Sequence, residues 1–351
     1  MVAVIVIGLV ALSVLLITHE LGHFFTAKAV GVKVEEFGLG FPPRLFGVRR
    51  GETLYSLNAI PFGGFTRLAG EEDPSVPRSL AGKSIGARLL VLGAGSLMNI
   101  LLALVLFSII FMVPADVVVG RVAVTEVAPD SPAYLADIEA GDVIVSVNGN
   151  PVQNLIELRS EVLPNLGEEI TLVISNAVSR EVKLVPRPNP PEGQGAMGVT
   201  LELSDQTTVR QSYPFWEAVP KGMAEFANTL VVYWDGIVSI FSGATPAEFL
   251  GPVGLVQLTG EIAVEAGARQ LLESAALISF LLGIFNLIPL PAVDGGRITF
   301  VLVELVRRGK RVSPKTEGLI HAIGFFLLIA LLMIVTYQDI MRIVTGGSFI
   351  P

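Results

Sequence analysis

The sequence predicts a polytopic α-helical membrane protein with about four transmembrane helices, an inserted small β-rich domain and a membrane-associated β-hairpin region. Of its 351 residues, 52% are hydrophobic and 16% are charged, and the mean hydropathy is +0.66, above that of ordinary soluble chains. The apolar residues gather into runs near or above the roughly 20 residues that cross a bilayer core of about 30 Å. Between the runs, apolar and polar residues alternate in short stretches bounded by glycines, which predicts strands and hairpins.

Four apolar runs are expected to cross the membrane. The first has no Lys or Arg before Lys28 and no small-residue cleavage site, so we expect it to be retained rather than removed as a signal peptide. The third contains Pro289 and Pro291, which remove helix hydrogen bonds and predict an interruption. The expected spans are residues 1–29, 89–113, 274–306 and 317–342.

Three long connections separate these spans. Residues 30–88 alternate around glycines and are expected to form membrane-associated β-hairpins. Residues 115–203 alternate repeatedly, with a turn at Asn148-Gly149, and predict the small β-rich domain. Residues 204–273 form a connector that fits either an interfacial amphipathic helix or a packed segment.

Composition excludes several classes of site. The chain has no cysteine, so it has neither a disulfide nor a thiolate metal site, and any metal must be held by nitrogen and oxygen. The formal net charge is −8, and no basic stripe with interleaved aromatic residues offsets it. The sequence therefore predicts no nucleic-acid partner.

Basic residues in the connections predict the orientation in the membrane. Residues 28–88 hold nine Lys and Arg and residues 297–315 hold six, whereas residues 114–273 hold eight against twenty-one Asp and Glu. Because Lys and Arg accumulate in cytoplasmic loops, the first and third connections are expected to be cytoplasmic. Four spans return the chain to its starting side, so the termini and the β-rich domain are expected on the outer side.

The first span carries the segment His19-Glu20-Leu21-Gly22-His23. Positions i and i+4 lie on one face of a helix, so both imidazoles can converge on a metal ion while Glu20 lies beside it. Two of the chain's three histidines fall in this segment, within an apolar span where ionisable groups are rare and costly. The pattern favours a zinc site over a purely structural pair of histidines.

A catalytic zinc ion typically has three protein ligands and one position for water, so a third ligand is expected elsewhere. Without cysteine, the candidates are His321 and an intramembrane carboxylate. Asp294 is favoured because prolines and glycines surround it, and broken backbone at membrane depth is tolerated where it lines a wet cavity. The alternatives are a helix-capping role for Asp294 and, for His321, a satisfied polar group at a helix start or a neighbour of the ligands.

These motifs and their order resemble the site-2 proteases, which are zinc intramembrane metalloproteases of the M50 type, and in particular the bacterial members with one PDZ domain. The resemblance spans nearly the whole chain. It departs from the family at Gly93-Ala94-Gly95, where a proline is expected after the first glycine. The segments that carry it are His19 to His23, Asn286 to Asp294, Val119-Gly120-Arg121-Val122, Ser131-Pro132-Ala133 and Gly141-Asp142-Val143-Ile144.

The resemblance implies a zinc-dependent intramembrane endopeptidase that performs regulated intramembrane proteolysis of single-span membrane proteins, such as anti-sigma factors or remnant signal peptides. It places the chain in a bacterial cytoplasmic membrane, with residues 115–203 as a PDZ-like domain outside and the active site near the cytoplasmic side. The implied partners are transmembrane substrates, the lipid bilayer and a peptide ligand of the PDZ-like domain. The implied cofactor is one Zn²⁺ per chain.

The expected roles follow from this chemistry. His19, His23 and Asp294 hold the metal, and Glu20 serves as general base and then acid. Asn286, Gly63 and Gly64 are candidate substrate-binding residues. The alternatives are that Asn286 bridges its own broken helix and that the hairpin around Gly63 only dips into the membrane. Rival functions are a non-catalytic membrane adaptor and, more weakly, a small transporter.

Overall fold

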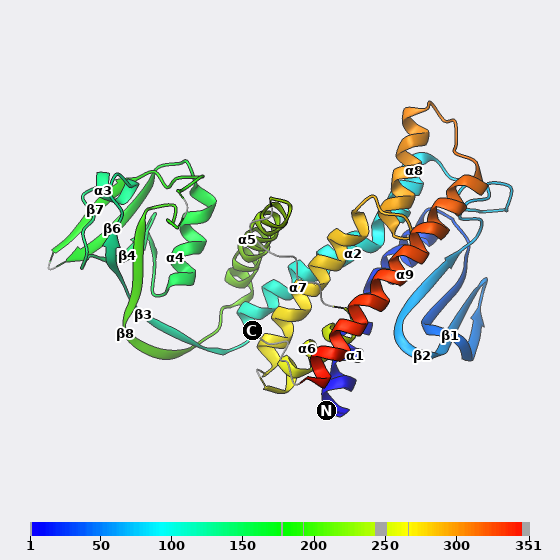
Figure 1. Ribbon diagram of the computed structural model, residues 1–351, viewed down its shortest axis with the longest axis horizontal. Helices are drawn as coiled ribbons and strands as arrows, with labels where there is room; N and C mark the ends of the chain where they lie inside the picture. Colours follow the sequence, from blue (N-terminus) through cyan, green and yellow to red (C-terminus); the bar gives the residue numbers. More distant parts are fainter. Residues whose placement is uncertain (1, 177, 192, 243–250, 266, 346–351) are drawn as a thin grey trace. The chain divides into compact units, whose positions relative to one another are not determined.

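The computed structural model describes residues 2–176, 178–191, 193–242, 251–265 and 267–345 (Figure 1). It divides into two compact units, of which the first comprises Met1–Ile110 and Ser239–Pro351 and the second comprises Phe111–Val238. We call the first the membrane unit and the second the inserted unit.

Within the described residues, four helices are long and apolar enough to cross a membrane. Many of their large apolar side chains are exposed, as with Phe326 at 70%, and a lipid environment would cover such side chains. A helix satisfies its own backbone hydrogen bonds, so these runs form helices rather than open strands in hydrocarbon. The four are α1 (Val2–Ala29), α2 (Ile85–Met112), α7 (Gly267–Leu287, apolar from Ala268) and α9 (Pro314–Val344).

A shorter apolar helix, α6 (Pro252–Glu265), packs closely against α1. Gly8 of α1 faces the backbone carbonyl of Val256, and Gly260 of α6 faces that of Val4, so a side chain at either glycine would collide with backbone. Small residues that let backbones approach are the usual basis of helix packing in membranes. The two helices are therefore held at close range.

The hairpin region consists of β1 (Val34–Arg50) and β2 (Thr53–Leu68). Gly38 pairs with Ser56 and also with Phe65, so the first half of β1 lies between two parts of β2. The long strand β2 therefore folds back on itself, with several register shifts along the pairing. The region is a small sheet rather than a simple two-stranded ribbon.

The last part of β2 lies along α1. Thr66 Oγ1 donates a hydrogen bond of 3.1 Å to the backbone carbonyl of Glu20, and Gly63 N donates one of 3.3 Å to Ser13 Oγ. These bonds fix β2 beside the helix that carries the histidine motif.

The third apolar run is divided into two helices, α7 and α8 (Asp294–Val306), with residues 288–293 between them. Pro289 and Pro291 cannot donate backbone hydrogen bonds, and Ala292 has φ +76°, so a continuous helix cannot form here. Asp294 is thus the first residue of α8. The predicted interruption of the third span therefore separates it into two helices.

The inserted unit is built on one antiparallel sheet with the strand order β7-β6-β4-β3-β8, in which β5 also pairs with β4. In β6 alternate residues are buried, so Ile170, Leu172 and Ile174 enter the core. Its elements are β3 (Ala115–Val127), α3 (Pro132–Leu135), β4 (Val143–Val147), β5 (Asn150–Pro151), α4 (Leu155–Val162), a 3-10 turn (Leu163–Asn165), β6 (Ile170–Asn176), β7 (Val178–Leu184), β8 (Val199–Gln211) and α5 (Phe215–Phe241) up to Val238.

Two features of this unit concern the predicted connector. Strand β8 pairs with β3 over its whole length, so the sheet continues to Gln211. Beyond it, α5 exposes Trp216 at 73% and Trp234 at 65%. Much of the connector is therefore a long helix with exposed aromatic side chains. Residues 243–250, also within the predicted connector, lie outside the described residues.

Candidate metal centre

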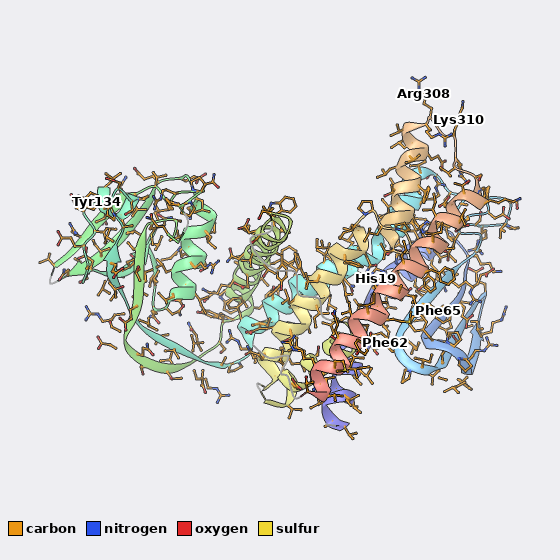
Figure 2. The ribbon with its side chains drawn as sticks, viewed as in Figure 1. His19, Phe62, Phe65, Tyr134, Arg308 and Lys310 are labelled. Atoms are coloured by element: carbon orange, nitrogen blue, oxygen red, sulfur yellow. The ribbon has the colours of Figure 1, made fainter. Side chains whose placement is uncertain are left out.

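His19 and His23 occupy successive turns of one face of α1. Both are buried, each with 8% of its surface exposed, and their Nε2 atoms lie 3.1 Å apart (His19 is labelled in Figure 2). The segment between them is uninterrupted helix, so the i, i+4 spacing alone brings the two imidazoles together. The separation is too short for two ring nitrogens that repel each other unless a proton or a cation lies between them.

Asp294 completes the group from the other end of the chain. Its Oδ2 atom lies 3.0 Å from His19 Nε2 and 3.1 Å from His23 Nε2. Within the described part of the chain, these three side chains are the one group whose potential ligand atoms all lie within 4.8 Å of one another. The structure thus brings the first residue after the break in the third apolar run against two residues of the first span.

The hydrogen bonds around His23 show what this group can hold. His23 Nδ1 lies 2.8 Å from the backbone carbonyl of Val91, which can only accept, so Nδ1 carries a proton and donates it. In the neutral form of such a ring, the lone pair lies on Nε2, which faces His19 and the Asp294 carboxylate. Converging lone pairs of this kind fit a cation.

The donor set fits zinc in particular. Two imidazole nitrogens and one carboxylate oxygen form a common catalytic zinc set with a fourth position free. Ligands at 2.0–2.1 Å in tetrahedral arrangement lie about 3.3 Å apart, close to the separations found here. The bond from His23 to a backbone carbonyl is also the usual device that orients a zinc-bound imidazole.

Two glycines make room for this group. Gly22 of α1 lies against the backbone of Ala94 in α2, so the two helices approach closely. A Cβ atom at Gly95 would lie 2.6 Å from His19 Nε2 and would also collide with the ring of His23. Gly95 therefore keeps the ligand space open, and the close approach of α2 brings Val91 within reach of His23.

Sequence reasoning did not find Val91 or Gly95 as site residues. Val91 contributes a backbone carbonyl, which every residue has, so no residue type could signal it. Gly95 had a partial signal, because it lies in the small-residue segment that departs from the family pattern, but that departure does not show which side chains the segment faces. In the structure α2 begins at Ile85, and Gly95 lies well inside the helix.

Glu20 lies beside the group without belonging to it. It is adjacent to His19 on α1, and the last part of β2 covers it, since a Cβ atom at Gly64 would lie 3.9 Å from Glu20 Cγ. Thr66 binds the backbone carbonyl of Glu20 and so holds β2 at this position. A carboxylate next to a metal site but not among its ligands can exchange protons with a water molecule there.

The candidate substrate-binding residues fall in two places. Gly63, with φ +68°, packs on Leu16 of α1, and Gly64 follows it next to Glu20. The side chain of Asn286 donates a hydrogen bond of 3.0 Å from Nδ2 to the carbonyl of Leu282, in the preceding turn of its own helix. His321 is outside the metal-ligand group, and its Nδ1 lies 3.1 Å from the backbone nitrogen of Ala292.

A family model described as peptidase family M50 matches residues 7–331. The chain belongs to peptidase family M50. Among its relatives, the "Putative zinc metalloprotease" of Clostridium acetobutylicum is 35% identical, covering 96% of this chain and 97% of that one. The zinc metalloprotease RasP of Oceanobacillus iheyensis is 29% identical, covering 94% of this chain and 97% of that one.

Among solved structures, a PDZ domain of an SdrC-like protein from Listeria monocytogenes is 22% identical, covering 23% of this chain and 85% of that one. Its TM-score of 0.21 is too low to carry an argument about the inserted unit.

Membership confirms the predicted resemblance to the site-2 proteases. This M50 chain is a zinc metalloprotease, and zinc is its cofactor. Its four apolar helices agree with a multi-pass membrane protein.

Proposed function

We propose that this chain is an intramembrane endopeptidase in which His19, His23 and Asp294 bind one Zn²⁺ and Glu20 is the general base. The observation that carries the proposal is the convergence of three ligand atoms at 3.0–3.1 Å from α1 and from the start of α8. Because α1 is long and apolar enough to span a bilayer, a metal bound on it would act on peptide bonds at membrane depth.

The residues of the site have separate roles in peptide hydrolysis. When bound, Zn²⁺ lowers the pKa of a water molecule and polarises the scissile carbonyl. Glu20 takes the proton of the attacking water and later delivers it to the leaving amine. His23 keeps its ring oriented through the bond to Val91.

A helical substrate must be unwound before its carbonyls can react. The last part of β2 runs beside Glu20, and an extended substrate segment added along it would place a peptide bond near the metal. Gly63 and Gly64 support this role because, without side chains, they let this part of β2 lie close to α1 and Glu20. Asn286 would bind the substrate backbone through Oδ1, an acceptor that its bond to Leu282 does not use.

The proposal also includes the orientation of the chain in the membrane and the class of its substrates. The distribution of Lys and Arg supports cytoplasmic connections after the first and third spans, with the inserted unit outside as a PDZ-like domain that binds or admits peptides. The substrates are single-span membrane proteins in a bacterial cytoplasmic membrane, such as anti-sigma factors or remnant signal peptides.

The test is cleavage by protein purified in detergent, with zinc content measured on the same sample. Wild type and Glu20→Gln are incubated with single-span reporter proteins and the products are identified by mass spectrometry. Glutamine keeps the shape but cannot accept the proton, so we expect retained zinc and lost cleavage. Equal cleavage by both proteins would refute the role of Glu20, and a zinc-free wild type without cleavage would support a non-catalytic adaptor instead.

A further inference from the structure

The turn that presents Asp294 has little regular structure of its own. Residues 288–293 lie between two helices, two of them are prolines, and Ala292 is held at φ +76°, a conformation that an alanine rarely adopts. Such a backbone persists only when its surroundings impose it. The position of Asp294, two residues after Ala292, therefore depends on what holds the turn.

One face of α9 holds it. The backbone N–H of Ala292 donates a hydrogen bond of 3.1 Å to Nδ1 of His321. Gly324 lies one helical turn further along, and Pro291 occupies the space where a Gly324 side chain would be. The hydrogen bond to Ala292 and the close contact with Pro291 come from the same face of α9. Together they fix the positions of two consecutive residues of the turn.

The bond fixes the state of the His321 ring. A backbone nitrogen can only donate, so Nδ1 is the acceptor, and the ring is neutral with its proton on Nε2. His321 Nε2 is buried and has no hydrogen-bond partner among the described residues. The ring also lies against Phe300 of α8, with a centroid separation of 5.4 Å. His321 thus contacts the turn through Ala292 and α8 through Phe300.

We propose that His321 is a positioning residue, whose neutral imidazole holds the Ala292 turn and thereby aims the Asp294 carboxylate at the two histidines. This rests on the proposed function, because it takes Asp294 as a zinc ligand. Residues that orient zinc ligands commonly change metal affinity or activity by about 10- to 100-fold when replaced. His321 would belong to that group although it lies 27 residues after Asp294 in the chain.

The test uses two replacements of nearly the same shape. In His321→Asn, the side-chain oxygen can accept the Ala292 bond in place of Nδ1, whereas His321→Leu fills similar space without an acceptor. Zinc affinity is measured in detergent by competition with a chromophoric chelator, and cleavage of a single-span reporter gives kcat and KM. We expect zinc affinity to fall about tenfold or more in H321L, with a lower kcat, and to stay within about threefold of wild type in H321N.

Gly324→Ala is an independent variant, because its methyl group would push Pro291 and move the turn while His321 stays intact. We expect it to weaken zinc binding as well. Phe326→Leu, at an exposed position of the same helix, is the control and should leave zinc affinity and kcat unchanged. If H321L does not fold, judged by gel filtration and circular dichroism, H321N and G324A still decide the question.

Three outcomes would overturn the proposal: wild-type zinc affinity in H321L, equal losses in H321L and H321N, or wild-type affinity in G324A. Failure of the proposed function looks different. In that case Asp294→Asn would bind zinc as tightly as wild type, or the zinc-loaded wild type would not cleave, whatever the His321 variants do.

Discussion

The proposed zinc ligands come from two regions with different backbones. His19 and His23 lie in an uninterrupted helix, where the repeat of the α-helix places them one above the other. Asp294 follows a turn broken by two prolines and by the positive φ of Ala292. In the first region the helix repeat alone brings the two ligands to one face, and contacts with α2 only orient their rings and leave them space. The second needs contacts from other segments, so its ligand should be the more sensitive to distant substitutions.

The largest effect is expected in the regular region, the uninterrupted helix that carries His19 and His23. One substitution there removes a catalytic group without altering the backbone. Glu20→Gln should lower kcat by about 100- to 10 000-fold, since it removes the proton acceptor for water. Zinc content should remain that of the wild type, because Glu20 is not among the convergent ligand atoms. Paired measurements of cleavage and zinc by mass spectrometry check this, and loss of zinc in E20Q would mean that Glu20 is a ligand.

In the broken region, Asp294→Asn should weaken zinc binding by about 100-fold or more, beyond the usual effect of residues that only support ligands. The amide keeps the shape but loses the charge that faces both imidazoles at 3.0 and 3.1 Å. Chelator competition gives the affinity, and dialysis against a chelator followed by added zinc should restore cleavage in the wild type. Asp73→Asn, an exposed residue, is the matched control.

Gly95→Ala tests whether the regular region also needs space from its neighbour α2. Its methyl group would collide with both imidazoles, so we expect at least about a tenfold loss of zinc affinity. Gly93→Ala is matched to it, since nothing lies within 4 Å of a Cβ atom there, and it should bind zinc normally. Equal behaviour of the two variants in the chelator assay would show that α2 does not approach the ligands this closely.

The smallest effect is expected outside both regions. Asn154 caps α4 in the inserted unit, and its side chain accepts a hydrogen bond of 2.8 Å from Glu157 N. Asn154→Ala should cost about 1 kcal/mol of the free energy of unfolding of this unit, measured by urea titration. Zinc affinity should not change. A change in zinc affinity would mean that the centre depends on more than the two regions compared above.

Much of the fold could be predicted from the sequence, because hydrocarbon leaves helices as the simplest solution for long apolar runs. The alternation in the inserted unit predicted strands for the same kind of reason. The folding back of β2 could not be predicted, since it depends on Gly38 pairing with two separated partners. The end of β8 at Gln211 could not be predicted either, because it follows from the pairing of β8 with β3 rather than from the composition of β8.

At the candidate site, the sequence predicted the side chains with distinctive chemistry and missed those that act through backbone or through space. His19, Glu20 and His23 share a spacing with chemical meaning, and Asp294 is a carboxylate in a proline-broken apolar run. Val91 acts through its carbonyl, so its residue type carries no signal. Gly95 matters only because another helix lies against it, which a single sequence does not reveal.

The central claim is that the two regions meet on one zinc ion. It is tested most directly by locating zinc in crystals of the zinc-loaded protein through anomalous scattering at the zinc absorption edge. We expect one zinc peak per chain, bonded to Nε2 of His19, Nε2 of His23 and a carboxylate oxygen of Asp294 at about 2.0–2.2 Å. A zinc ion bound to the histidines with Asp294 turned away, or bound at another place in the chain, would contradict it.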